Sequence, residues 1–119
     1  MEIITHTING EKIAEVISDN LVINNNQDGL ELLVNLYYQD FDRIILHEKN
    51  IIPTFFDLKS GMAGEILQKF STYNVCLSIV GDFSKYISNS LHDFIYESNK
   101  GRHISFVSSV SDAISKLSA

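Results

Sequence analysis

Short apolar runs alternate with helical patterns along most of this chain, and this alternation restricts the fold more than any other feature. Apolar runs at residues 43–47, 75–80 and 103–107 are short enough to be buried strands. Each is followed by a segment whose apolar residues recur every three or four positions, as on one face of a helix. Such alternation predicts a mainly parallel sheet with right-handed crossovers and helices packed on it.

The start of the chain predicts an antiparallel pair of strands in front of this pattern. Residues 3–8 are β-branched and roughly alternating, and Asn9-Gly10 follows them. Both turn residues tolerate a positive φ, so residues 11–17 are expected to return as the second strand of a hairpin. The next helix has its apolar face at Leu30, Leu33, Val34 and Tyr37. The predicted order is therefore ββαβαβαβα, in one α/β domain that spans residues 1–119.

Three helix ends can be predicted from local signals. The second helix starts either at a cap on Thr54 or near Ser60. Ser90 and Asp93 form a capping box for the third helix, and Gly101 is expected to end it in the left-handed conformation. Gly61 and Gly64 weaken a helix, so their position in its first turns predicts a close approach of the backbone to another element or to a ligand.

The charge of the chain argues against two classes of partner. Its 15 acidic and 9 basic residues give a formal net charge of −6. A negative surface repels the phosphates of nucleic acids and of anionic lipids, so neither nucleic acid nor a membrane is expected as a main partner. The chain opens without a signal peptide, and no apolar stretch approaches the ~20 residues of a membrane span. We therefore expect a cytoplasmic protein.

Polar side chains gather where the predicted parallel strands end. The carboxyl ends of parallel strands meet at one edge of a sheet, where α/β folds place their working groups. We therefore expect the polar residues after the strands to share one functional rim with the start of the second helix. The predicted ligand-binding or partner-binding residues are Glu48, Asp57, Ser60, Gly61, Asp82 and Ser84.

A catalytic use of this rim is an alternative. His47 could act as a base for Ser60 or Ser84, with the Glu48 carboxylate beside it. Adjacent residues of a strand point to opposite faces, however, so His47 and Glu48 do not readily serve one site. The sequence therefore predicts no catalytic residue.

A metal-binding use of the rim is a second alternative. Glu48, Asp57 and Asp82 could hold Mg²⁺, which accepts carboxylates from loops. Capping of local turns accounts for the same carboxylates, so no metal and no cofactor are expected. Lys59-Ser60-Gly61 could also bind an anion through free N–H groups at the helix start.

The element order and one motif resemble the STAS domain, the anti-sigma-factor-antagonist fold. In that family a strand is followed by an apolar pair and then by Asp-Ser-Ser-Gly at a helix start, and the first serine can accept a phosphate from a partner kinase. Phe55-Phe56-Asp57 is similar to the apolar pair and the aspartate, and Ser60-Gly61 to the final Ser-Gly, with Leu58-Lys59 between them. The resemblance implies a STAS-like sheet, with Leu58 or Ser60 at the phosphorylatable position.

Several segments also resemble an uncharacterised bacterial family of single small domains. They are His47-Glu48-Lys49-Asn50, residues 55–70, Gly81-Asp82-Phe83-Ser84 and residues 94–101. This resemblance implies a bacterial cytoplasmic protein and brings no known activity with it.

The sequence as a whole favours a non-enzymatic regulatory or protein-interaction domain. It would act through the rim around Ser60 and Asp82, with or without a phosphate on Ser60. The alternative is a small-molecule or anion-binding protein, or a minor hydrolase, that uses the same rim. A protein partner is expected, and a homodimer joined through exposed helix faces is a third interpretation.

Overall fold

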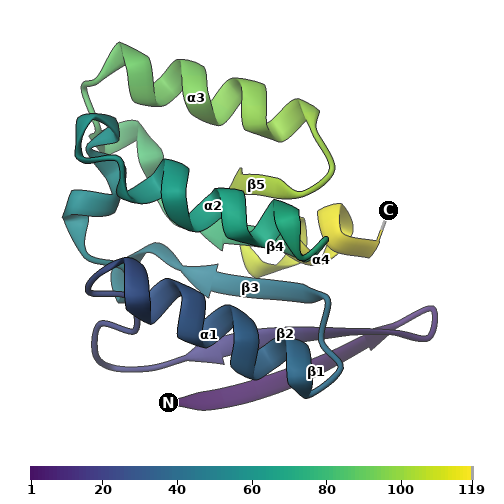
Figure 1. The fold of residues 1–119 in the computed structure, drawn as a ribbon. Helices are drawn as coiled ribbons and strands as arrows, with labels where there is room; N and C mark the ends of the chain where they lie inside the picture. Colours follow the sequence, from purple (N-terminus) through teal and green to yellow (C-terminus); the bar gives the residue numbers. More distant parts are fainter. Residues whose placement is uncertain (119) are drawn as a thin grey trace.

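The computed structural model describes residues 1–118 and shows a five-stranded mixed sheet covered by helices (Figure 1). The strands are β1 (Glu2–Ile8), β2 (Glu11–Ile17), β3 (Arg43–His47), β4 (Cys76–Val80) and β5 (Ile104–Val107). The first two pair antiparallel, the others continue in parallel, and the sheet order follows the chain order. The α/β class and the ββαβαβαβα order predicted from the sequence are confirmed.

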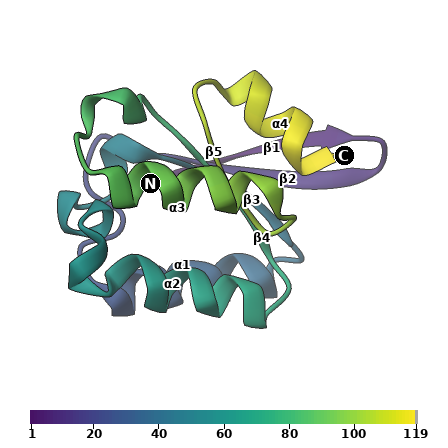
Figure 2. The same ribbon diagram turned by 90° about the horizontal axis from the view of Figure 1, so that it is seen from above.

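Four α-helices connect or follow the strands: α1 (Asn26–Tyr38), α2 (Met62–Thr72), α3 (Asn89–Lys100) and α4 (Val110–Ser118). Figure 2 shows α1 and α2 on one side of the sheet and α4 on the other. Four short 3₁₀ turns follow β3 and β4: η1 (Glu48–Asn50), η2 (Pro53–Phe56), η3 (Leu58–Ser60) and η4 (Phe83–Lys85). These turns replace regular structure at the carboxyl ends of the two strands.

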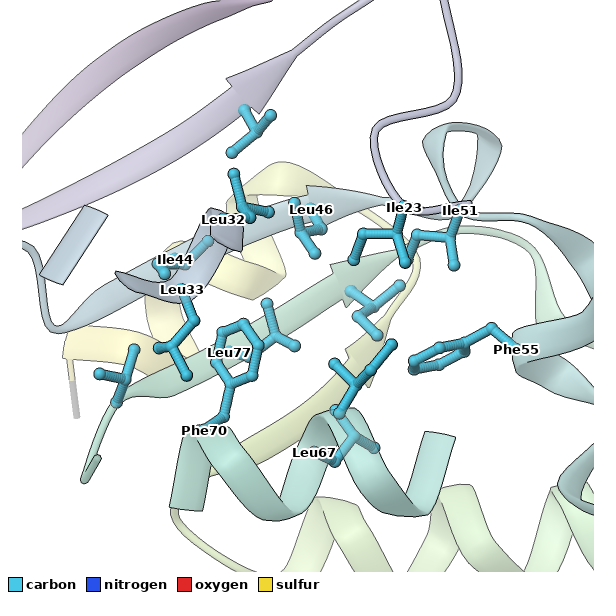
Figure 3. Close-up of a cluster of buried hydrophobic side chains, with 14 of the residues drawn as sticks. Ile23, Leu32, Leu33, Ile44, Leu46, Ile51, Phe55, Leu67, Phe70 and Leu77 are labelled. Atoms are coloured by element: carbon cyan, nitrogen blue, oxygen red, sulfur yellow. The ribbon is translucent and has the colours of Figure 1, made fainter. Parts of the chain in front are cut away.

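The two faces of the sheet bury separate cores. The larger core contains side chains of α1, α2 and α3, and Figure 3 shows Phe55, Phe70 and Leu77 converging in it. Along β3 the side chains alternate, so that Leu46 enters the larger core and Ile45 enters the smaller core under α4. Full burial of an isoleucine or leucine contributes about 1.5–3 kcal/mol, so these alternating positions fix which face each helix covers.

The hairpin turn and the first helix start follow the predicted local chemistry. Asn9 and Gly10 have φ values of 52° and 81°, as a two-residue turn of type I′ requires. Asn25 caps α1, because its side-chain oxygen accepts a hydrogen bond from the Asp28 N–H at 2.8 Å. The regular helix α2 begins at Met62, so the later of its two predicted starts is the right one.

The helix α3 ends at Lys100 with Gly101 after it, as predicted, but its predicted start cap and the predicted conformation of Gly101 are wrong. Ser88 caps this helix in place of Ser90, and its Oγ accepts from the Leu91 N–H at 3.1 Å. Gly101 has a φ of −88° and is extended, so it does not make the left-handed turn. A second serine two residues earlier satisfies the same geometric requirement, and the local pattern does not distinguish the two.

The predicted close approach of Gly61 and Gly64 to another element of the chain is also wrong. A Cβ at either position would meet nothing within 4 Å. Gly61 has a φ of 80°, so glycine is needed there for the left-handed entry into α2. The tight contacts occur elsewhere: a Cβ on Gly29 would come within 2.9 Å of the Ile66 side chain, and one on Gly81 within 2.6 Å of Glu48 Cβ.

Candidate functional site

An open cleft lies at the carboxyl ends of β4 and β5, on the side of the sheet that α4 covers. Its volume is about 630 Å³. Asp82, Ser84 and Phe83 enter it from η4, which directly follows β4. Asp112 and Lys116 enter it from α4, one helical turn apart. The cleft therefore combines two carboxylates, one ammonium group and hydroxyls around an apolar floor.

Asp82 is held in an ionised state by its neighbour. Its Oδ1 accepts hydrogen bonds from the Ser84 Oγ at 2.5 Å and from the Ser84 backbone N–H at 3.1 Å. These two hydrogen bonds lower the pKa of the Asp82 carboxyl below its usual value, with a smaller contribution from the charge of Lys85. The Ser84 hydroxyl donates a hydrogen bond to the Asp82 carboxylate, so the pair presents one negative charge at the mouth of the cleft.

Glu48 lies beside the cleft and is buried. Its Oε2 forms an ion pair with Lys85 Nζ at 2.7 Å and accepts a hydrogen bond from the Tyr86 hydroxyl. The missing side chain of Gly81 leaves the space that the Glu48 side chain occupies. Glu48 thus holds the segment that follows β4 in place, because its carboxylate binds both Lys85 and Tyr86.

Tyr86 is held in place by Glu48 on one side and by the larger core on the other. It stacks on Phe56, with ring centroids 5.3 Å apart, and Phe56 also contacts Phe83 at 6.0 Å. Burial raises the pKa of the Tyr86 hydroxyl, and the hydrogen bond to Glu48 and its negative charge raise it further. The phenol therefore stays protonated and keeps donating to Glu48.

The other predicted rim residues lie in a separate turn at the start of α2. Asp57 accepts from the Lys59 N–H at 3.2 Å, and Gly61 is the left-handed residue before the helix. Ser60 Oγ donates to the Thr54 carbonyl at 2.9 Å and accepts from the Met62 N–H at 3.2 Å. The residues that line the cleft include Asp82 and Ser84 but not Asp57, Ser60 or Gly61. The structure thus brings Asp82 and Ser84 together and places Glu48 behind them, with the η3 residues apart.

His47 belongs to a different cluster. Its Nε2 lies 2.8 Å from Glu15 Oε2, while His6 Nε2 lies 2.8 Å from Glu15 Oε1. Burial raises the pKa of the Glu15 carboxyl, but the hydrogen bonds from both histidines and their charge lower it more, so it lies below its usual value of 4.5. His47 is therefore directed to Glu15, and within residues 1–118 no hydrogen bond joins it to Ser60 or Ser84.

Asp112 and Lys116 are the cleft residues that the sequence prediction missed. Asp112 also takes part in the cap of α4, in which its N–H donates to Ser109 Oγ at 3.1 Å. The i, i+4 spacing of Asp112 and Lys116 places them on one side of the helix, and this was the available signal. Lys116 Nζ also donates to the Asn99 carbonyl at 2.7 Å, which ties α4 to the end of α3.

The arrangement of acidic side chains does not favour the magnesium alternative. In residues 1–118 no group of three or more histidine, cysteine, aspartate or glutamate side chains is arranged to hold a metal ion. Glu48, Asp57 and Asp82, the proposed Mg²⁺ ligands, instead bind Lys85, Lys59 and Ser84 respectively. None of the described helices has the length and apolar character needed to cross a bilayer.

Comparison with known proteins identifies a family. The family described as "Domain of unknown function (DUF4180)" matches residues 8–117. No curated protein matches the chain. Among solved structures, the chain is similar to one called a "putative anti-sigma factor antagonist" from Thermotoga maritima, with 10% sequence identity, a TM-score of 0.49, and coverage of 98% of this chain and 95% of that chain. Since the family match spans nearly all of the sequence, the predicted resemblance to an uncharacterised family is confirmed, and the chain belongs to the DUF4180 family.

Proposed function

We propose that this chain is a single-domain regulatory protein of the bacterial cytoplasm that binds a protein partner at the end of β4 and β5. The binding surface, called the η4 surface below, consists of Asp82, Phe83, Ser84, Ile87, Asp112 and Lys116. The observation that carries the proposal is the exposure of Ile87, whose side chain is 97% exposed directly after η4. Protein-binding surfaces combine apolar side chains with a polar rim, and in the proposed surface Ile87 and Phe83 are the apolar members.

The loop that carries Ile87 is fixed on both sides. Tyr86 before it is held by Glu48 and by stacking on Phe56, and Ser88 after it caps α3. His92 Nε2 also bonds the Tyr86 carbonyl at 2.5 Å. The backbone at Ile87 is therefore ordered before any partner binds. Binding of a partner over Ile87 would cost this chain little conformational entropy.

The charges of the η4 surface favour a partner that presents positively charged hydrogen-bond donors. Asp82 and Asp112 are exposed carboxylates in the cleft, and Lys116 is partly engaged by the Asn99 carbonyl. A partner with an apolar side chain that covers Ile87 and an arginine or lysine that reaches Asp82 would match this surface. The formal net charge of −6 adds a long-range attraction for a basic partner surface.

We infer that phosphorylation of Ser60 would act on this surface indirectly. A phosphate on Ser60 removes the hydroxyl proton that Ser60 donates to the Thr54 carbonyl in η2. Phe56, in the same turn, supports Tyr86 by stacking. A phosphate at the start of α2 would also be stabilised by the helix dipole and free N–H groups, so the modified state is physically accessible.

Site-specific cross-linking in the native host cells tests the proposal. A photoreactive residue is placed at position 87, and in a control variant at Gln68, which is exposed on α2. We expect a covalent adduct with one protein from position 87 only, and a weaker adduct when Asp82→Asn is added. The identified partner, purified separately, should bind the purified chain with the same dependence on Asp82.

Equal adducts from both positions, or no adduct from position 87, would contradict the proposal. The phosphorylation step is tested with Ser60→Asp and Ser60→Ala in the same purified pair. We expect the aspartate to change the dissociation constant severalfold and the alanine to change it less, since alanine adds no charge. Equal affinity of all three proteins would remove Ser60 from the proposal and leave the η4 surface.

The cleft also supports a second candidate function, the binding of a small polar molecule. Its volume of about 630 Å³ lies within the range of ligand sites, and Lys116 and Asp112 could bind a zwitterion. Native mass spectrometry of the chain purified from its host distinguishes the two functions. A retained small molecule that is lost in Asp112→Asn would favour ligand binding over the partner proposal.

A further inference from the structure

The outer edge of β1 is open. β1 stands at one end of the sheet order and pairs with β2 on its inner side, and within residues 1–118 no strand pairs with its outer side (Figure 1). The strand is seven residues long and pairs with β2 along its whole length without a bulge. An open edge of this kind presents unpaired backbone N–H and C=O groups, which are a template for another strand.

The hairpin geometry identifies which backbone groups point outward. Ile8 and Glu11 flank a two-residue turn, so they form a hydrogen-bonded pair, and the pairs then alternate along the ladder. Ile3, Thr5 and Thr7 therefore occupy the pairs that are not hydrogen-bonded to β2. Their N–H and C=O groups are directed to the open edge.

The opposite edge of the sheet is closed by a side chain. Asn99 of α3 lies along the outside of β5, where its Oδ1 accepts from the Phe106 N–H at 2.7 Å and its Nδ2 donates to the Phe106 carbonyl at 3.1 Å. β5 is also only four residues long. One edge is thus short and capped, whereas β1 is long and has no comparable cap among the described residues.

The sequence of β1 lacks the features that usually block strand addition. It contains neither lysine nor proline, and Glu2 at its start is its single charged residue. Ile4 is 41% exposed on the side of the strand that faces away from the larger core. These properties favour another strand as the occupant of the edge, and they match the properties of β1 itself.

We propose that two copies of this chain pair through β1, antiparallel about a two-fold axis at Thr5, so that their sheets become continuous. Thr5 then lies opposite the second copy's Thr5, and Ile3 opposite its Thr7. These outward-facing pairs would form about six backbone hydrogen bonds. Ile4 would lie opposite the second copy's His6, which covers its exposed side chain.

The pairing is free of charge conflict. Glu2 would lie opposite the second copy's Ile8, so the only charged residue of the strand meets no like charge. The edge is at the far end of the sheet order from β5, and a dimer formed there leaves the η4 surface accessible. The proposal is therefore independent of the function proposed above and replaces the helix-face dimer considered from the sequence.

Charge substitutions at the two-fold axis provide the test. Thr5→Lys and Thr5→Glu each place two like charges opposite one another, and each is expected to raise the dimer dissociation constant about tenfold or more. An equimolar mixture of the two variants should dimerise again, because lysine then faces glutamate. Sedimentation equilibrium measures both effects, and Ser71→Lys on exposed α2 is the control with the same change in net charge.

A measurement on the unmodified chain tests the dimer even if the variants fail to fold. Amide hydrogen exchange of Ile3, Thr5 and Thr7 should slow as protein concentration rises, while the Ile4 and His6 amides, bonded to β2, stay protected throughout. An unmodified chain that remains monomeric at NMR concentrations, or a mixture of the charge variants that stays monomeric while each is folded, would overturn the proposal. Uniform protection of all five amides at every concentration would overturn it as well.

Discussion

Glu48 lies so close to Gly81 that no side chain fits between them. A Cβ on Gly81 would be 2.6 Å from Glu48 Cβ and 2.7 Å from its Oε1. This contact joins the turn after β3 to the end of β4, and it fixes the carboxylate that Lys85 and Tyr86 bind. The position of the η4 surface therefore depends on a glycine that lies outside the predicted binding residues.

Substitution of Gly81 by alanine should destabilise the fold by about 1–3 kcal/mol, because the new methyl group overpacks a buried site. The displaced Glu48 would also lose its hydrogen bond from Tyr86, so the phenol should ionise at a lower pH than in the unmodified chain. Urea unfolding measures the first effect, and absorbance at the tyrosinate band during alkaline titration measures the second.

Gly64→Ala is the matched control for this prediction. Its Cβ would meet nothing within 4 Å, and the residue lies inside α2. Alanine removes backbone entropy from the unfolded chain and favours the helix, so a gain of about 0.5–1 kcal/mol is expected. A loss of stability in Gly64→Ala, or an unchanged stability in Gly81→Ala, would contradict the contact geometry.

The His6–Glu15–His47 cluster should make the fold sensitive to acid. The pKa of Glu15 is lower in the folded chain than its usual value of 4.5, so the unfolded chain binds the proton first as the pH falls. The stabilisation is therefore complete above pH 4.5 and decreases below it, by up to about 1.4 kcal/mol per pH unit, until the folded carboxyl titrates. Glu15→Gln should be less stable at neutral pH and should show a shallower decline between pH 4.5 and 3.

Chemical denaturation at a series of pH values measures this difference. Glu2→Gln is the control, because Glu2 is exposed and, within residues 1–118, makes no hydrogen bond to a histidine. An acid decline that is equally steep in Glu15→Gln and in the unmodified chain would show that the two histidines do not stabilise the ionised carboxylate.

The fold could be predicted from the sequence because its signals are local. The period of the apolar residues distinguishes strands from helices, and Asn9-Gly10 specifies a hairpin turn through its positive φ values. Contacts between distant residues have no such signal. The space around Gly81 depends on Glu48, and the space around Gly29 depends on Ile66, so neither close approach could be inferred from the glycine itself.

The rim could be predicted only in part, for a similar reason. Asp82 and Ser84 follow β4 closely, and three intervening residues at most leave little freedom in where they lie. Two short turns, η1 and η2, separate β3 from η3, and Ser60 is the last residue of η3. The path of those turns depends on the burial of Phe55 and Phe56, which local polar patterns do not encode.

Tyr86 should make the fold sensitive to base. Burial and the Glu48 carboxylate raise the pKa of its hydroxyl above the ordinary value of 10.0, so the unfolded chain loses this proton first. The stabilisation is complete below pH 10 and decreases above it, at up to about 1.4 kcal/mol per pH unit. In Tyr86→Phe the decline between pH 10 and 11 should be shallower, with a loss of about 0.5–1.5 kcal/mol at neutral pH.

Unfolding by urea at pH 7, 10 and 11 measures the effect of Tyr86. The control is Tyr38→Phe, since Tyr38 is 80% exposed and its hydroxyl makes no hydrogen bond to a carboxylate of the described residues. If Tyr86→Phe and Tyr38→Phe change the alkaline decline equally, the hydrogen bond to Glu48 does not hold the proton of Tyr86.

Asn99 should be essential for the stability of the β5 edge. Asn99→Leu has a similar volume but leaves the buried Phe106 N–H and carbonyl without partners, at a cost of about 1–3 kcal/mol. The exposed edge should also pair with other molecules, so the variant is expected to form higher oligomers at concentrations where the unmodified chain does not. Asn35→Leu on the exposed side of α1 is the control and should change stability by less than about 0.5 kcal/mol. Light scattering and urea unfolding measure the two effects, and an Asn99→Leu protein that is as stable and as small as the control would show that its two hydrogen bonds do not protect the sheet.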